Sequence, residues 1–265
     1  MRAVPDSLDA TVVAAIDERL VRVAGEHGVT IPWAVESGSR AWGFPSPDSD
    51  YDCRFVFVRP RDAYLSPWPP RDVIETPLDR VLDVNGWDLV KALRLLEKGN
   101  AVLLEWLRSP IVYAGDTAFR DGLLMVAEQI AEREAVGRHY LHVGLKQWTG
   151  GPVPSLKKFF YALRPAASIA WLRVHPSCVV PPMDLPTLLV EAEVPDAVRA
   201  AAEDLIARKA VTRELGGGEV PPALQRFVLD QYAWAEPEFE HAPRSDRTEA
   251  RRIAERFFLA TLERR

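Results

Sequence analysis

The chain has 265 residues, of which 48% are hydrophobic and 27% are charged. These values are ordinary for a folded globular protein and exclude wholesale disorder, and the length is sufficient for two domains of ordinary size. The formal charge of −5 and the pI near 5.6 argue against a basic surface that coats nucleic acid. A polyanionic partner would therefore have to be held by a local basic groove.

The cysteine count and the hydropathy indicate the cellular compartment. Cys53 and Cys178, the only cysteines, form neither a CxxC pair nor a zinc-binding pattern, so a reduced, cytoplasmic protein is expected. Residues 1–20 carry acids within their apolar stretch, which is not typical of a signal peptide. No run of about 18 apolar residues predicts a membrane span, and the membrane is not an expected partner.

The first elements predicted along the chain are a helix and two strands. Apolar residues recur at helical spacing over residues 8–27, with Ser7 as a candidate N-cap and Gly28 as a stop. WAVE, residues 33–36, is a strand candidate that ends at a Ser37-Gly38-Ser39 turn. CRFVFV, residues 53–58, is a second strand, rich in aromatic and β-branched residues.

The next segment alternates loops with regular structure. Residues 60–77 are rich in proline and predict a surface loop, because proline cannot donate to a sheet ladder. Residues 79–84 predict a third strand, Asn85-Gly86 predicts a turn, and residues 87–98 predict a helix.

Strand signals nearly vanish beyond a short apolar IVY at residues 111–113. Alanine, leucine, glutamate and arginine dominate residues 119–138, 197–215 and 245–265, which predict helices, and GGGEVPP at residues 216–222 predicts a loop. The expected fold class is α+β, with a mixed sheet and flanking helices over residues 1–115 and a mainly helical domain over residues 116–265.

Three aspartates stand directly before the second strand. Because strand residues alternate faces, Asp50 and Asp52 are predicted to point the same way. Two converging carboxylates repel each other unless a cation lies between them, and Mg²⁺ or Mn²⁺ suits carboxylate oxygens. Asp83 is the candidate third ligand, with Asp88 and Glu75 as rivals. A simple Asp/Ser turn is the alternative interpretation of the acids taken alone.

A glycine-serine pair precedes the acids. Gly38 allows close backbone approach and Ser39 offers a hydroxyl and an amide, which suits a phosphate held beside a metal ion. Carboxylate-bound metal ions that bridge substrate phosphates are the recurrent equipment of phosphoryl and nucleotidyl transfer. The segment from Gly38 to Asp52 therefore predicts a nucleotide site.

A basic face is predicted on one helix of the second half. Lys157, Tyr161 and Arg164 fall on the same side of a helix, with Lys158 alongside. Such a face suits a triphosphate or a stacked base, although a solvated lysine pair with a tyrosine in the core is the commoner arrangement. His139 and His142 lack a partner that would complete a zinc site.

The order G-S, glycine, then D-S-D-x-D at a strand-turn-strand junction resembles the DNA polymerase β nucleotidyltransferase superfamily. The resemblance implies two-metal nucleotidyl transfer. Gly38 and Ser39 would hold the nucleotide phosphates, Asp50 and Asp52 would bind both metals, and Asp83 would help to bind the second metal and activate the incoming hydroxyl. The helical domain would close over the nucleotide site.

Further segments narrow the resemblance. LDVNGWDL, LLEWL, KKFFYALRP and PPMDLPTLL, together with ESGSRAWGFPSPDSDYD, resemble the RNA repair pathway DNA polymerase beta family. The resemblance implies a nucleotidyltransferase that uses ATP or another nucleoside triphosphate, with an RNA 3′ end as the acceptor. Arg40, Arg54, Lys158 and Arg164 are the candidate triphosphate or RNA contacts.

Two alternatives remain open at the level of sequence. The acceptor is a protein side chain or a small molecule in the first, which the low overall basicity mildly favours. The second is a nucleotide-binding or RNA-binding module without turnover, against which the intact Gly38, Ser39, Asp50 and Asp52 speak.

Overall fold

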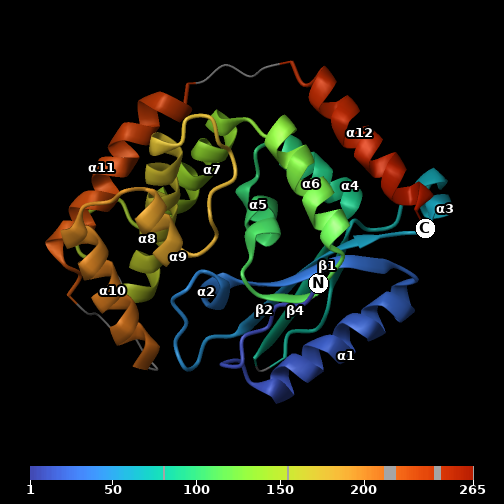
Figure 1. Ribbon diagram of the computed structural model, residues 1–265, viewed down its shortest axis with the longest axis horizontal. Helices are drawn as coiled ribbons and strands as arrows, with labels where there is room; N and C mark the ends of the chain where they lie inside the picture. Colours follow the sequence, from blue (N-terminus) through green and yellow to red (C-terminus); the bar gives the residue numbers. More distant parts are fainter. Residues whose placement is uncertain (80, 154, 212–218, 242–245, 265) are drawn as a thin grey trace.

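The computed structural model describes residues 1–265 apart from residues 80, 154, 212–218, 242–245 and 265. A five-stranded mixed sheet carries helices on both faces, and a largely helical part lies beside it (Figure 1). This arrangement confirms the predicted α+β class with a helical C-terminal part.

The strand order in the sheet is β3-β4-β2-β1-β5. β1 runs antiparallel to β2 and to β5, β2 runs parallel to β4, and β3 runs antiparallel to β4. The parallel β2–β4 pair matters for the site because it places the beginnings of two strands side by side. The strands are β1 (Thr30–Ser37), β2 (Tyr51–Val58), β3 (Val73–Glu75), β4 (Leu82–Asp88) and β5 (Val112–Gly115).

Both faces of the sheet are covered, which explains why its central strands are apolar on both sides. Ala34 and Phe55 pack with helix α1 (Ala10–His27) on one face. Val35 and Val56 belong to the larger core on the other face. The helices of that second face are α4 (Leu89–Glu97), α5 (Ala101–Arg108) and α6 (Thr117–Ile130).

The second half of the chain is helical, as predicted, and α8 (Leu156–Val174) lies at its centre with most of its residues buried. α12 runs back along α6 and α4 (Figure 1). The larger apolar core is continuous from the sheet to α11, and the division at residues 115 and 116 stays a prediction. The other helices here are α7 (Arg133–Leu145), α9 (Leu185–Glu191), α10 (Asp196–Val211), α11 (Pro222–Phe239) and α12 (Thr248–Glu263).

The turn predicted at Asn85-Gly86 is wrong, because both residues lie inside β4. A Cβ on Gly86 would lie 2.1 Å from the ring of Phe55, so the glycine serves close packing against a neighbouring strand. The helix predicted over residues 87–98 begins later, at Leu89, where the carboxylate of Asp88 accepts a hydrogen bond from the amide of Val90.

Other local predictions also need correction. The N-cap of α1 is Asp9, not Ser7, and its carboxylate accepts from two amides of the first turn. The proline-rich segment contains helix α3 (Arg61–Leu65) as well as β3, and the Ser37-Gly38-Ser39 turn is the start of a short helix, α2 (Gly38–Ala41). Of the predicted loop at residues 216–222, residues 216–218 lie outside the described part of the chain.

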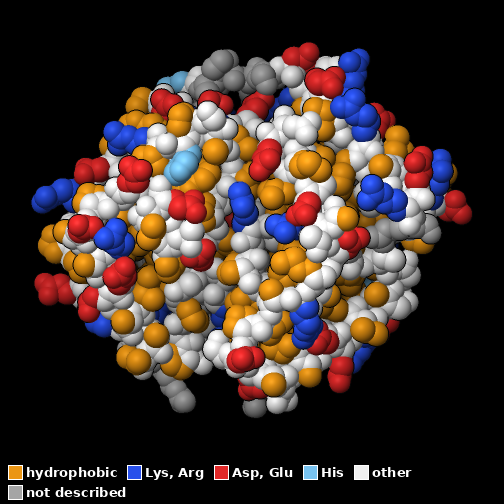
Figure 2. Space-filling view, viewed as in Figure 1, with side chains coloured by type: hydrophobic (Ala, Val, Ile, Leu, Met, Phe, Trp, Pro, Cys, Tyr) orange, Lys and Arg blue, Asp and Glu red, His pale blue; other side chains and the backbone are white. Residues whose placement is uncertain are grey.

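The surface agrees with the modest negative charge. Acidic and basic side chains are interspersed over the face shown in Figure 2, without a broad basic patch. Cys53 is buried in the sheet and Cys178 is exposed, and both are free. None of the helices in the described part of the chain combines the length and the hydropathy that a membrane span requires.

Candidate active site

Two acids meet where β2 and β4 begin. The parallel register places Asp52 directly opposite Asp83, and Asp50 stands just before β2. Asp88, one of the rivals, lies opposite Phe57 farther along the same pair of strands, and Glu75 lies on β3 opposite Asn85. Asp83 is therefore the candidate third acid that the sheet brings beside Asp52.

Arg54 lies between the two carboxylates. Its Nη2 is 3.1 Å from Oδ1 of Asp52 and 2.6 Å from Oδ2 of Asp83, and its Nη1 donates to the main-chain oxygen of Asp83. The alternation of β2 puts Arg54 on the same side as Asp52. In this structure the cation between the acids is a guanidinium group.

Charges from several elements act on Asp52. Burial raises the pKa of its carboxyl, Arg54 opposes that rise, and the negative charges of Asp83 and Asp50 add to it. Lys157, from α8 in the helical part, also lowers the pKa. The three predicted acids thus form one electrostatic cluster, which a cation from the other half of the chain faces.

Gly38 fits against this cluster. Its φ of +62° belongs to the left-handed region, and a Cβ built on it would lie 2.1 Å from Oδ2 of Asp52. Glycine is therefore required here both for its backbone conformation and for the space it leaves beside the carboxylate. The neighbouring Ser39 donates its hydroxyl to the hydroxyl of Ser49, at 2.9 Å, which ties α2 to the acid-bearing loop.

Arg40 also holds the acid-bearing loop. Its Nη2 donates to the main-chain oxygen of Ser49 at 2.6 Å, its Nε donates to that of Asp50 at 3.2 Å, and its guanidinium lies 3.9 Å from the ring centroid of Tyr51. These contacts position Asp50 through its backbone. The predicted contact of Arg40 with a nucleotide stays a prediction.

Glu36 is a site residue that the sequence interpretation missed. It is fully buried, its Oε1 accepts from the amide of Asp52 at 2.9 Å, and its Oε2 accepts from the hydroxyl of Tyr113 at 2.5 Å. Burial raises its pKa to about 7, although both hydrogen bonds oppose that rise. A lone glutamate inside the apolar strand WAVES was the available signal, because a buried acid needs partners.

We expect Glu36→Gln to flatten the pH dependence of stability between about pH 4.5 and pH 7. In the wild type the folded carboxyl keeps its proton to about pH 7, whereas the unfolded one ionises near 4.5. The free energy of unfolding should therefore fall as pH rises through this window, by at most about 1.4 kcal/mol per pH unit. Urea unfolding of both proteins across the window measures this slope, and parallel slopes would contradict it.

The helical part contributes two lysines near the acids. The positive charge of Lys157 acts on Asp52, and Lys209 on α10 donates to the main-chain oxygen of Phe44 at 2.5 Å. Burial and the positive charge of Lys157 lower the pKa of Lys209 to about 8, although Asp48 opposes the shift. The sequence interpretation missed Lys209, whereas it placed Lys157 on the predicted basic face of α8. Lys158, which was included, is exposed on α8, and its predicted contact stays a prediction.

Arg164 lies inside the protein. It is 3% exposed, its Nη1 is 2.7 Å from Oε1 of Glu105, and its Nε donates to the main-chain oxygen of Met183 at 2.9 Å. Its guanidinium also lies 5.0 Å from the ring of Trp42, which follows α2. The structure thus uses Arg164 to join α8, α5 and the segment after α2, and its predicted contact with a triphosphate stays a prediction.

The donor set suits a hard divalent ion, since Asp50, Asp52 and Asp83 supply carboxylate oxygens. In the described part of the chain, however, no group of three acidic, histidine or cysteine side chains is close enough to hold a metal ion. Arg54 occupies one oxygen of Asp52 and one of Asp83. A metal ion would therefore compete with Arg54 for the same carboxylates.

We expect Arg54→Ala to bind Mn²⁺ about tenfold more tightly than the wild type in the absence of nucleotide, because the competing guanidinium is gone. Calorimetric titration of the protein with Mn²⁺ measures this change. Arg22→Ala, which removes an exposed arginine of α1, is the matched control. Unchanged or weaker binding by Arg54→Ala would show that the guanidinium does not compete with the ion.

The sequence profile of the RNA repair pathway DNA polymerase beta family matches residues 12–259. The chain belongs to this family. The match includes the sheet, the acid cluster and most of the helical part, and the family's name describes a polymerase-β-like nucleotidyltransferase of RNA repair. A relative from Bacillus subtilis (strain 168), named Uncharacterized protein YcgL, is 42% identical over 203 residues, 76% of this chain and 77% of that protein.

Proposed function

We propose that this member of the RNA repair pathway DNA polymerase beta family moves a nucleoside monophosphate from a nucleoside triphosphate to a hydroxyl group and releases pyrophosphate. The RNA 3′ end is the proposed acceptor and Mg²⁺ or Mn²⁺ the proposed cofactor. The observation that supports this best is the pairing of Asp52 with Asp83 across two parallel strands, with Gly38 packed against the Asp52 carboxylate.

Asp50, Asp52 and Asp83 are the proposed metal ligands. When bound, the ions would neutralise charge on the phosphates and favour ionisation of the attacking hydroxyl. In the transfer, the acceptor oxygen forms a bond to the α-phosphorus while the bond from that phosphorus to the pyrophosphate oxygen breaks, and the hydroxyl proton leaves toward Asp83. The new product is a phosphodiester when the acceptor is RNA.

The other residues of the site bind and orient. Gly38 keeps the backbone close to Asp52, and the amide of Ser39 is the proposed donor to a phosphate oxygen. The charge of Lys157, on α8 in the helical part, acts on Asp52, and the charges of Lys157 and Asp48 act on Lys209. These two cations are suited to the negative charge of a triphosphate, which would be held between the sheet and the helices.

Incubation of the protein with labelled nucleoside triphosphates, Mg²⁺ or Mn²⁺, and either mixed RNA or cell lysate tests the proposal. The comparison protein is the double variant Asp50→Ala, Asp52→Ala. We expect metal-dependent label on RNA with the wild type alone. Label on protein but not on RNA would show that the acceptor is a protein side chain. If the wild type transfers no more label than the double variant to any acceptor, nucleotidyl transfer is excluded.

A further inference from the structure

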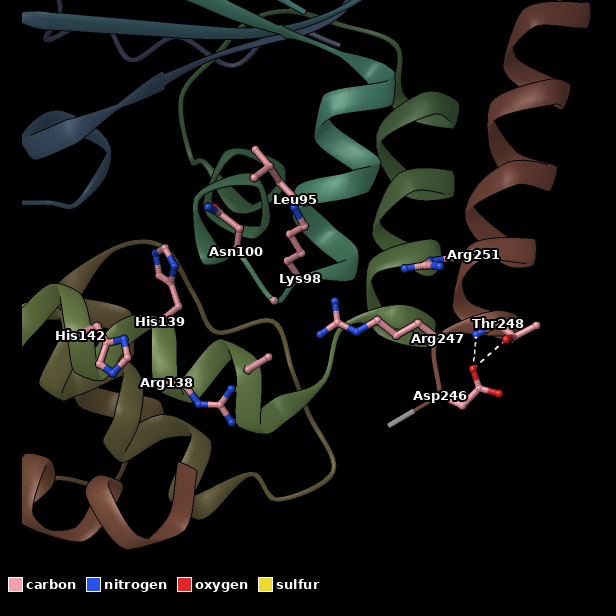
Figure 3. A pocket seen from close by; sticks show the side chains of 12 residues that line it. Leu95, Lys98, Asn100, Arg138, His139, His142, Asp246, Arg247, Thr248 and Arg251 are labelled. Atoms are coloured by element: carbon pink, nitrogen blue, oxygen red, sulfur yellow. Dashed lines mark hydrogen bonds between the residues drawn. The ribbon is translucent and has the colours of Figure 1, made fainter. Parts of the chain in front are cut away.

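A second cavity lies apart from the acid cluster. It has a volume of about 790 Å³ and opens where the turn between α4 and α5 meets α7 and the start of α12 (Figure 3). None of the acids at the start of β2 or β4 lines it. A cavity of this size is in the range of small-ligand sites.

Basic side chains dominate the wall of this cavity. It carries Lys98, Arg138, Arg247 and Arg251 against one acid, Asp246, a formal excess of three positive charges with histidine neutral. The whole chain, by contrast, has a net charge of −5. Arg138 and Arg247 reach toward the same space from opposite sides in Figure 3. The cavity is therefore a local concentration of positive charge on an acidic protein.

Hydrogen bonds and ion pairs hold the arginines in place. Arg138 donates through Nε and Nη2 to the main-chain oxygen of Phe239, at 3.0 and 2.8 Å. Arg251 pairs through Nε with Glu97 at 2.6 Å. A guanidinium group has five donors, so the Nε contact of Arg251 with Glu97 leaves its Nη groups for a ligand.

The remaining cations have looser partners. Arg247 lies 3.9 Å from Glu132, at the outer limit of an ion pair, and Lys98 is exposed and forms no ion pair with any residue that the structure describes. At that separation the attraction is weak, so a doubly charged ligand could compete for Arg247.

Two helix N-termini add to the positive potential. α5 begins after Asn100 and α12 begins at Thr248, and both residues line the cavity. The partial positive charge at a helix N-terminus favours phosphate groups. His139 and His142, which in the sequence lack a partner to complete a zinc site, also line the cavity.

We propose that this cavity, between the α4–α5 turn, α7 and the start of α12, is a second ligand site that binds a phosphate ester. The phosphate belongs either to the backbone of a nucleic-acid strand or to a free nucleotide or pyrophosphate. The site is separate from the acid cluster, and binding to it requires no turnover. Its occupancy can therefore be measured whether or not the proposed transfer takes place.

Fluorescence anisotropy of a labelled single-stranded oligoribonucleotide, with pyrophosphate as the competitor, tests the site. The variants are Lys98→Glu and Arg247→Gln, and the charge-matched control is Arg22→Glu on the opposite face of the sheet. Lys98 and Arg22 are both exposed, so neither charge reversal should disturb packing. Thermal unfolding confirms that each variant is folded.

We expect Lys98→Glu to weaken binding of the oligoribonucleotide about tenfold and to reduce its salt dependence by about one phosphate contact. Arg247→Gln should weaken it in the same direction, whereas Arg22→Glu should bind as the wild type does. If pyrophosphate binds and the oligoribonucleotide does not, direct titration with pyrophosphate should rank the affinities of the wild type and the variants in the same order. Equal affinity of wild type and both cavity variants for both probes would overturn the proposal.

Discussion

Replacing Asp52 with asparagine is expected to slow nucleotidyl transfer on the order of 10³-fold. Asparagine keeps the shape of the side chain but removes the charge that Arg54 pairs with and that a metal ion would require. Because burial already raises the pKa of the Asp52 carboxyl, a neutral side chain should not unfold the protein. Initial rates at saturating nucleotide, with thermal unfolding of each protein, measure both effects.

Asp48→Asn is the matched control for this variant. It makes the same change of charge in the same loop, but Asp48 lies outside the strand register that brings Asp52 beside Asp83. Its rate should stay within a few-fold of the wild type, since Asp48 lies in a turn before β2 and only opposes the pKa shift of Lys209. A comparable loss in both variants would show that charge in the loop, rather than the Asp52 carboxylate, sustains the reaction.

Arg164→Met is expected to lower the free energy of unfolding by about 3–5 kcal/mol, because it leaves Glu105 buried without its cationic partner. The two side chains are 4% and 9% exposed and 2.7 Å apart. Methionine is unbranched and fills a similar space, so the lost charge rather than a cavity should dominate the effect. Urea unfolding monitored by circular dichroism measures the change.

The double variant Arg164→Met, Glu105→Leu separates charge from packing. Removing both partners should recover much of the stability that the single variant loses, because apolar residues of similar volume often replace a buried ion pair at little cost. Full recovery is not expected, since Arg164 also donates to Met183 and Glu105 accepts from the indole of Trp42. A double variant as unstable as the single one would assign the effect to packing.

The fold was predictable where the local pattern was strong. CRFVFV predicted a strand because it is rich in aromatic and β-branched residues, and the apolar residues of α1 predicted a helix because they recur at helical spacing. Asn85-Gly86 misled because its turn propensity is local, whereas its place in β4 depends on the ring of Phe55 from a neighbouring strand. The N-cap of α1 is Asp9 and not Ser7, and the sequence did not decide between them because both side chains can accept a hydrogen bond from a first-turn amide.

The sequence predicted which acids could form the site, but not which strands lie side by side. Asp52 follows from alternation along β2, whereas Asp50 stands just before that strand and its shared direction with Asp52 stays a prediction. The choice of Asp83 over Asp88 and Glu75 depends on the register of β2 with β4, which the sequence does not contain. The role of Arg54 between two acids depends on that same register.

The contributions of the helical part were the hardest to predict. Lys157 and Lys158 are neighbours in sequence, and only the packing of α8 decides that Lys157 faces Asp52. Lys209 is separated from the acids by most of the chain and stands in a helix with no distinguishing motif. The helical spacing of Arg164 predicted a contact with a ligand, because the sequence does not show that Arg164 is buried against Glu105.

The position of the transferred label tests the proposed reaction most directly. With Mg²⁺ or Mn²⁺ and an RNA acceptor, the wild type should place label from the α-phosphate of a nucleoside triphosphate on the RNA and release unlabelled pyrophosphate. Label from the γ-phosphate should not reach the RNA, and Asp52→Asn, Asp83→Asn should transfer neither. Label from the γ-phosphate on the acceptor, or α-label transfer that persists in the double variant, would contradict nucleotidyl transfer by these acids.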